Sequence, residues 1–153
     1  MKFALLALLV ITAPIPAASW GRYENQLYGY SIDVPPGLVG RGEAGNGDGQ
    51  DFTSPTVTLM VRALPTPEGF EAALRDWRNW EAGQGWNMVY EMLTPTQAAL
   101  SARRADWLME LRAVTICGEA AVMFQLEYGV TDAGRMNDTV GRLASSLKAT
   151  RKC

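Results

Sequence analysis

Carboxylates are the side chains of this sequence that could carry out acid–base chemistry, because its 153 residues include no histidine. Without histidine the chain cannot form a Ser-His-Asp triad, a Cys-His pair or a zinc site with histidine ligands. Glu91, Glu110 and Glu127 lie on neighbouring strand-like segments, and two carboxylates about 5–9 Å apart are the minimum machinery of a glycosidase. One hypothesis is therefore a small carboxylate-dependent hydrolase or ligand-binding enzyme, with Glu110 and Glu127 as the pair to test.

The same glutamates have a simpler interpretation as polar cross-strand pairs. Alternation along the strands places Glu110 with Arg112 and Glu127 with Gln125, and such neighbours interact across or along a sheet surface. We favour this interpretation. We therefore expect a protein that is not an enzyme, with no catalytic residue and no cofactor.

A glycine-rich polar segment over residues 40–51 gathers the side-chain oxygens of Asn46, Asp48 and Asp51. Calcium could use such oxygens, but it needs about six to eight of them, and the segment lacks the spacing and the later bidentate glutamate of an EF-hand. The dipeptides Asn-Gly and Asp-Gly are instead typical of turns that require positive φ. We predict a solvated hairpin loop and no metal site, with cation binding as the open alternative.

Tryptophan is frequent, with five residues, and aromatic side chains often form recognition surfaces. Trp77 falls on the apolar stripe of a predicted helix and Trp107 lies in an apolar strand-like run, so we expect both in the core. Trp80 and Trp86 are less determined by their neighbours. They are the candidate contact patch for a partner.

The first 19 residues are typical of a secretory signal peptide. Lys2 precedes an apolar run at residues 3–11, which is too short for the roughly 20 residues that cross a bilayer. Proline breakers follow, and small residues at 17–19 favour cleavage after Ser19 or one residue earlier. We expect residues 20–153 to form one domain that is periplasmic or secreted, with no membrane span after cleavage.

Export would bring Cys117 and Cys153 into an oxidising compartment, where cysteines normally pair. We predict an intramolecular disulfide that stabilises the fold by roughly 3–4 kcal/mol. An intermolecular bond and free thiols are the alternatives. Neither cysteine lies in a Cys-x-x-Cys motif, which argues against a catalytic redox role.

Composition and charge narrow the class of protein further. Hydrophobic residues make up 48% and charged residues 20%, as in ordinary globular domains. The net charge of −2 argues against nucleic acid as a partner, because phosphate binding needs clustered Lys and Arg. We expect a monomer whose partner, if any, is an envelope protein.

Hydrophobic periodicity predicts an α+β fold. A period of two predicts strands over residues 28–34, 56–64, 86–93, 98–103, 105–116 and 120–128. A helix is expected from Thr66 as N-cap and Pro67 as first residue to about Gly83, and a second from Asp132 as N-cap. Apolar residues on both faces of the later strands require cover on both sides. The expectation is an antiparallel sheet of about six strands flanked by two helices.

Three segments also resemble known sequences. Residues 28–38 (YGYSIDVPPGL), 46–54 (NGDGQDFTS) and 140–147 (VGRLASSL) together are similar to small exported bacterial proteins of the PsbP-like superfamily. The resemblance implies an antiparallel sheet held between helices, and it implies no catalytic residue here. Its members serve as assembly factors, partner-binding proteins or proteins of unknown role. The leading hypothesis is thus an accessory or partner-binding module, with a purely structural envelope protein as a third reading.

Overall fold

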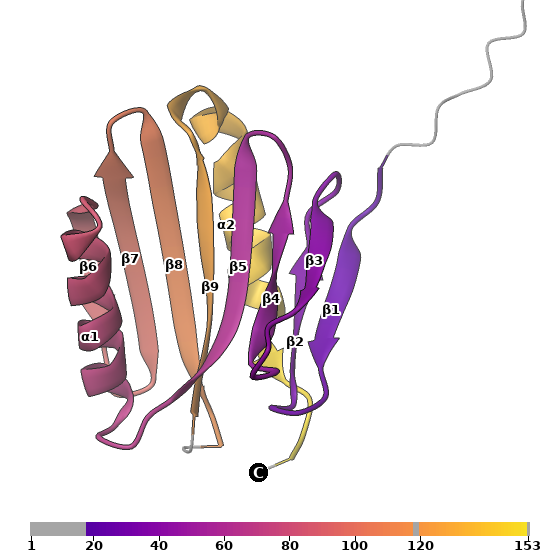
Figure 1. Cartoon of the computed structure of the whole chain (residues 1–153), viewed down its shortest axis with the longest axis vertical. Helices are drawn as coiled ribbons and strands as arrows, with labels where there is room; N and C mark the ends of the chain where they lie inside the picture. Colours follow the sequence, from indigo (N-terminus) through magenta and orange to yellow (C-terminus); the bar gives the residue numbers. More distant parts are fainter. Residues whose placement is uncertain (1–17, 118–119, 153) are drawn as a thin grey trace, which may run out of the picture.

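The computed structural model describes residues 18–117 and 120–152. That part of the chain contains ten strands and two α-helices (Figure 1). The strands form a main sheet of seven and a smaller sheet of three. The main sheet has the order β3-β4-β5-β9-β8-β7-β6 and the small sheet has the order β1-β2-β10. All pairings are antiparallel. The predicted α+β class is confirmed. Five of the six predicted strands lie in the main sheet as β5 to β9, the sixth is β2 of the small sheet, and the sequence did not predict β1, β3, β4 or β10.

The elements follow one another along the chain as strands interrupted by two helices. They are β1 (Gly21–Asn25), β2 (Tyr30–Val34), β3 (Val39–Glu43), β4 (Gly49–Thr53), β5 (Val57–Pro65), α1 (Phe70–Gly83), β6 (Asn87–Leu93), β7 (Gln97–Arg104), β8 (Trp107–Ile116), β9 (Ala120–Gly129), a 3-10 turn (Val130–Asp132), α2 (Ala133–Ser146) and β10 (Lys148–Ala149). None of the helices in the described ranges has the length and apolar character that a membrane crossing requires.

One face of the main sheet, here the α2 face, is covered by α2 and by the small sheet (Figure 1). Met136, Val140 and Leu143 of α2 are buried against it, at the helical spacing that the sequence predicted. Tyr30 and Ile32 of β2 fill the same core. A helix and a small sheet therefore cover most of this face, and a hollow lined by Ser101, Glu110 and Arg112 stays open beside α2.

The opposite face, here the α1 face, is covered by α1 alone. Phe70 and Leu74 of α1 pack with Leu100 of β7 and Leu111 of β8 in a second core. Met60 on the same face of β5 is only partly buried. One helix is too narrow to cover seven strands, so part of this face stays open.

The glycine-rich segment, predicted to be a solvated hairpin loop, does form a hairpin, but most of it lies in the paired strands β3 and β4 and only residues 44–48 form the connecting turn. Long-range contacts hold it in this form against the low strand propensity of glycine. The Tyr23 hydroxyl donates to Glu43 at 2.8 Å and the Asn25 amide donates to the Gly47 carbonyl at 2.8 Å. At Gly49 a Cβ would lie 1.9 Å from the Val61 carbonyl oxygen, so only glycine fits there.

The first helix begins at Phe70, later than the predicted start at Thr66 and Pro67. Gly69 has φ 96° at the N-cap, and its N–H donates to the Thr66 carbonyl at 3.0 Å. A left-handed residue cannot belong to a right-handed helix, so residues 66–69 form a turn. The predicted stop at Gly83 is confirmed, as is Asp132 at the N-cap position of α2.

Two predictions fall on residues that the structure does not describe. Residues 1–17 of the predicted signal peptide, which ends at residue 19, lie outside the described residues. Cys153 lies outside them as well. The signal peptide and the bond between Cys117 and Cys153 therefore stay predictions.

Candidate functional site

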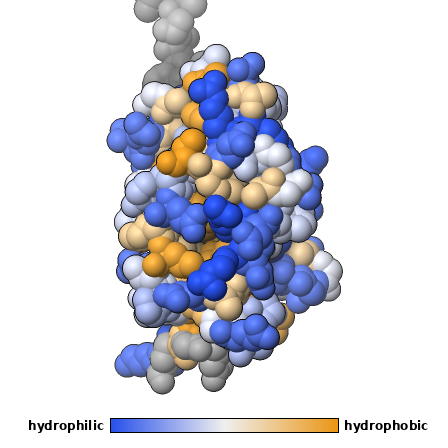
Figure 2. All heavy atoms as spheres, turned by 90° about the vertical axis from the view of Figure 1, so that its left-hand side faces the viewer, coloured by the Kyte–Doolittle hydropathy of each residue, from blue (hydrophilic) through white to orange (hydrophobic). Residues whose placement is uncertain are grey.

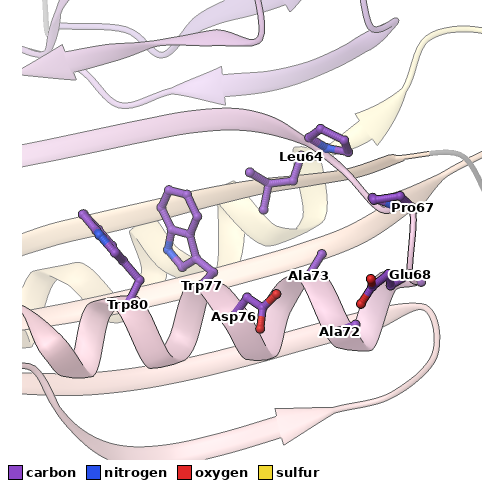
Figure 3. Close-up of a pocket in the computed structure, with 10 residues that line it drawn as sticks. Leu64, Pro67, Glu68, Ala72, Ala73, Asp76, Trp77 and Trp80 are labelled. Carbon is purple, nitrogen blue, oxygen red and sulfur yellow. The ribbon is translucent and has the colours of Figure 1, made fainter.

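A groove of about 630 Å³ runs between α1 and β5 on the open part of the α1 face. The outer side of α1 and β6 is mostly hydrophilic, with separate apolar spots (Figure 2). Within the groove, Trp77 and Trp80 project from the helix and Leu64 points toward them from β5 (Figure 3). We call this hollow the α1 groove; its lining is Leu64, Pro65, Pro67, Glu68, Gly69, Ala72, Ala73, Asp76, Trp77 and Trp80.

The indole pair is the most distinctive part of the α1 groove. Trp77 and Trp80 are three positions apart on α1, which places both on one side of the helix. Their ring centroids are 5.6 Å apart with an interplanar angle of 48°. Trp80 is 56% exposed. A large aromatic surface is thus presented to solvent on a well-ordered element.

A second hollow of about 290 Å³ adjoins the first, because Trp77 and Trp80 line both. Polar side chains from β4, β5, β7 and β9 meet the end of α1 there. We call it the polar cleft; its lining is Asp51, Thr58, Met60, Trp77, Trp80, Glu81, Gln84, Trp86, Arg104, Gln125 and Glu127.

A hydrogen-bonded network centred on Gln125 forms part of the polar cleft. The Gln125 amide donates to Glu81 Oε1 at 2.8 Å and to Glu127 Oε1 at 2.9 Å. Gln125 Oε1 accepts from the Trp77 indole N–H at 3.0 Å. These three bonds fix the orientation of the amide and bring two carboxylates onto one donor group.

Glu81 is 2% exposed, although it is a charged residue on the helix. Burial raises the pKa of its carboxyl group, the hydrogen bond from Gln125 partly offsets this, and the negative charge of Glu127 raises the pKa further. Glu81 lies on the buried side of α1 together with Phe70 and Leu74, but helical spacing does not reveal its partner on β9.

Trp86 is buried, so its predicted role as an exposed contact residue is wrong. It is 3% exposed and belongs to the core under α1. Gly85 with φ 90° turns the chain back, and the Trp86 N–H donates to the Glu81 carbonyl at 3.2 Å. The Arg104 guanidinium covers the ring at 4.3 Å from its centroid. The predicted exposure of Trp80 is confirmed.

Trp107, which we expected in the core, is instead 41% exposed. It begins β8 opposite Arg104 in the register, at the end of the strand where little covers it. Trp77 is partly buried against the core, as predicted, but it also forms a wall of both hollows.

The hydrolase hypothesis loses its carboxylate pair. In the register of β8 and β9, Glu110 lies opposite Leu126 and Glu127 lies opposite Met109, so the two glutamates are on opposite faces of the sheet. Glu110 forms an ion pair with Arg112 at 3.0 Å and Glu127 bonds to Gln125, as the simpler interpretation predicted. Glu91 is paired with Arg78 at 3.1 Å. The three carboxylates cannot act together.

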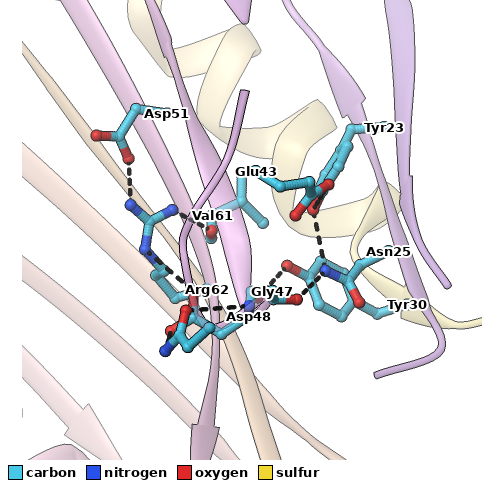
Figure 4. A network of polar contacts seen from close by, with 10 residues as sticks. Tyr23, Asn25, Tyr30, Glu43, Gly47, Asp48, Asp51, Val61 and Arg62 are labelled. Atoms are coloured by element: carbon cyan, nitrogen blue, oxygen red, sulfur yellow. Dashed lines mark hydrogen bonds and ion pairs between the residues drawn. The ribbon is translucent and has the colours of Figure 1, made fainter. Parts of the chain in front are cut away.

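The side-chain oxygens of the glycine-rich hairpin lie in a network with Arg62 (Figure 4), although the buried Asp48 Oδ1 accepts no hydrogen bond from the described residues. Arg62 lies 2.8 Å from Asp51 and 3.6 Å from Asp48, and the Asn46 amide donates to Asp48 at 2.9 Å. The guanidinium supplies the positive charge that a cation would bring. In residues 18–117 and 120–152 no group of three or more His, Cys, Asp or Glu side chains could hold a metal ion.

Known proteins resemble this chain in structure. No family model matches the sequence, and no curated protein sequence matches it. Cyanobacterial PsbP (CyanoP) from Synechocystis sp. PCC 6803 superposes with a TM-score of 0.67 and 18% identity, over 92% of this chain and 98% of that one. The Ran-binding protein Mog1p from Saccharomyces cerevisiae superposes with a TM-score of 0.64 and 8% identity, over 88% and 97% of the two chains. The expected PsbP-like fold is thus confirmed.

Proposed function

We propose that this PsbP-like domain is an exported, non-enzymatic accessory module that binds a protein partner through the α1 groove. The observation that carries the proposal is the exposed indole of Trp80, held beside Trp77 over an apolar groove on a helix. Tryptophan is enriched among the residues that dominate binding energy at interfaces, because it offers a large and rigid contact area. A lone exposed tryptophan on a flat surface would not support the same inference.

Two further observations support a binding role over catalysis. The glutamates considered for hydrolysis lie on different faces and are engaged in separate pairs. The yeast structural neighbour is a Ran-binding protein, so protein recognition is one use of this fold. Because a fold does not determine function, no partner is carried over.

Export is part of the proposal, and it rests on the sequence. Mass spectrometry of the protein recovered from the cell envelope tests it together with the disulfide. We expect an N-terminus at Trp20 or one residue earlier, and a gain of about 2 Da on reduction, as for one disulfide within a chain. An intact N-terminus, or a mass that reduction leaves unchanged, would contradict the corresponding part of the proposal.

Site-specific photocrosslinking in cells tests the partner. A photoreactive residue at exposed Glu68 or Asp76 in the α1 groove should capture one and the same envelope protein, while one at exposed Asp138 on α2 should not. Trp80→Ala should reduce the capture at least tenfold. Tyr90→Ala is the matched control, because Tyr90 is an exposed aromatic residue outside the groove.

Equal capture from α2 and from the α1 groove would overturn the proposed surface. So would a Trp80→Ala variant that captures as well as the Tyr90→Ala variant. A purely structural envelope protein predicts no specific capture from any of these positions.

A further inference from the structure

The lining of the α1 groove and the polar cleft is rich in negative charge. Among the described residues that line the two hollows, the acidic ones are Asp51, Glu68, Asp76, Glu81 and Glu127 and the only basic one is Arg104. Asp51 is paired with Arg62. Four carboxylates therefore face one guanidinium.

The two inner carboxylates form no ion pair with a described residue, although the positive charge of Arg104 in the same cleft acts on Glu81 from a distance. Glu81 and Glu127 share the amide of Gln125, and neither belongs to any ion pair between described residues. Charges interact more strongly where burial excludes water. A positive group that entered the cleft would meet two negative partners held in place by the same network.

Aromatic faces surround these carboxylates. Trp77, Trp80 and Trp86 line the polar cleft, and the Arg104 guanidinium already lies 4.3 Å from the Trp86 ring centroid. A cation over an indole face is stabilised by the quadrupole of the ring. The exposed ring of Trp80 offers a comparable face to a second cation.

We propose that the polar cleft binds a lysine or arginine side chain from an extended segment of the protein partner, with an adjacent apolar residue of that segment in the α1 groove. The inference rests on the proposed function and names the chemistry of its partner. The cationic group lies among Glu81, Glu127 and the indole of Trp80. The groove beyond Trp77 and Trp80 is lined by small apolar side chains such as Ala72 and Ala73, which suit an aliphatic residue.

Peptide probes test the charge preference. The probe is acetyl-Leu-Ala-Arg-Ala-Leu-amide, compared with the same peptide carrying citrulline or glutamate in place of arginine. Binding to the whole protein is followed through the indole N–H signals of its tryptophans by NMR. We expect the arginine peptide to shift the Trp77 and Trp80 signals and to bind at least tenfold more tightly than the citrulline peptide. Equal binding of the two peptides, or tighter binding of the glutamate peptide, would overturn the inference.

Variants locate the site. Glu127→Gln should weaken the arginine peptide at least fivefold and leave the citrulline peptide unchanged. Glu110→Gln is the matched control, since Glu110 is a carboxylate on the neighbouring strand that faces the other side of the sheet. Arg104→Gln should tighten binding, because it removes a competing positive charge from the cleft. If Glu127→Gln and Glu110→Gln change the affinity for the arginine peptide equally, in variants that circular dichroism shows to be folded, the inferred binding site is wrong.

The peptide experiment and the crosslinking experiment test separate claims, so a negative result in one does not overturn the claim tested by the other. If Trp80→Ala abolishes capture of the partner while the peptides show no preference for positive charge, the proposed function holds and this inference is wrong. If the peptides bind as expected but the α1 groove captures no protein, the cleft has the inferred ligand chemistry and the proposed function is wrong.

Discussion

The two faces of the main sheet are built from the same strands and differ in what covers them. On the α2 face, Leu59 and Val61 of β5 and Phe124 and Leu126 of β9 have no exposed surface. On the α1 face, the intervening positions of these strands include Met60 and Gln125, which line the polar cleft. The comparison teaches that the sheet presents side chains to a ligand where its cover is incomplete: at the polar cleft on the α1 face and, on the α2 face, at a hollow beside α2 lined by Ser101, Glu110 and Arg112. Indoles border only the first of these two hollows.

The sharpest test of this comparison is a pair of neighbours on β5. Leu59→Ala should destabilise the fold by about 3 kcal/mol, because it leaves a cavity in a closed core. Met60→Ala should cost only about 1 kcal/mol, because its side chain already borders an open cleft. Urea unfolding of the two variants measures the difference. Equal losses would show that the two faces are equally closed.

The second test concerns the polar network of the α1 face. Gln125→Leu should destabilise the fold by about 2 kcal/mol at pH 7, because it leaves two carboxylates and the Trp77 N–H without their shared partner. Gln97→Leu is the control, since Gln97 is exposed on β7, and it should change stability by less than about 0.5 kcal/mol. Similar unfolding midpoints for both variants would mean that the network contributes nothing to stability.

The sequence predicted the elements that depend on local pattern. The stripe of Phe70, Leu74 and Glu81 and the doubly apolar strand β9 both follow from periodicity. The turn of the β3–β4 hairpin was predicted from its Asn-Gly and Asp-Gly dipeptides, but its strands were not, because they are held by Tyr23 and Asn25, which are distant in sequence.

The candidate site was predicted only in part, and for a similar reason. The sequence offered both Trp80 and Trp86 as exposed residues and did not separate them, because burial of Trp86 depends on the turn at Gly85 and on Arg104. Glu81 and Glu127 accept from the same Gln125 amide only because α1 packs against β9 in the tertiary structure. Periodicity gives the face on which a residue lies, and it does not give the partner that lies opposite.

The third test uses pH to probe Glu81. Since burial raises its pKa in the folded state above the value of the unfolded chain, its contribution to stability is fully present below the unfolded pKa and is lost as pH rises through the folded pKa. Glu81→Gln removes this dependence, so the stability of the variant relative to the original should increase as the pH rises above the unfolded pKa and should level off above the folded pKa. Denaturant midpoints at several pH values measure it. A constant difference would contradict the pKa shift.

The smallest expected change in stability comes from glycine-to-alanine variants in the two helices that cover the main sheet. Gly141 lies within α2 and has open space where a Cβ would stand, so Gly141→Ala should stabilise the fold by about 0.5–1 kcal/mol. Gly83→Ala, at the last residue of α1, should give a smaller gain, because helix propensity matters less at a helix end. Thermal unfolding distinguishes the two. A loss of stability in Gly141→Ala would reveal a contact of α2 that the structure does not show.

The pairing of β10 with β2 determines when the chain can fold. Ser31 of β2 lies between Glu24 of β1 and Lys148 of β10, so the small sheet joins segments that are more than a hundred residues apart in the sequence. Until residues 133–149 have been made, the α2 face lacks both its helix and β10. A chain that lacks these residues therefore leaves the apolar side chains of the α2 face uncovered, and exposed apolar surface of this kind favours aggregation.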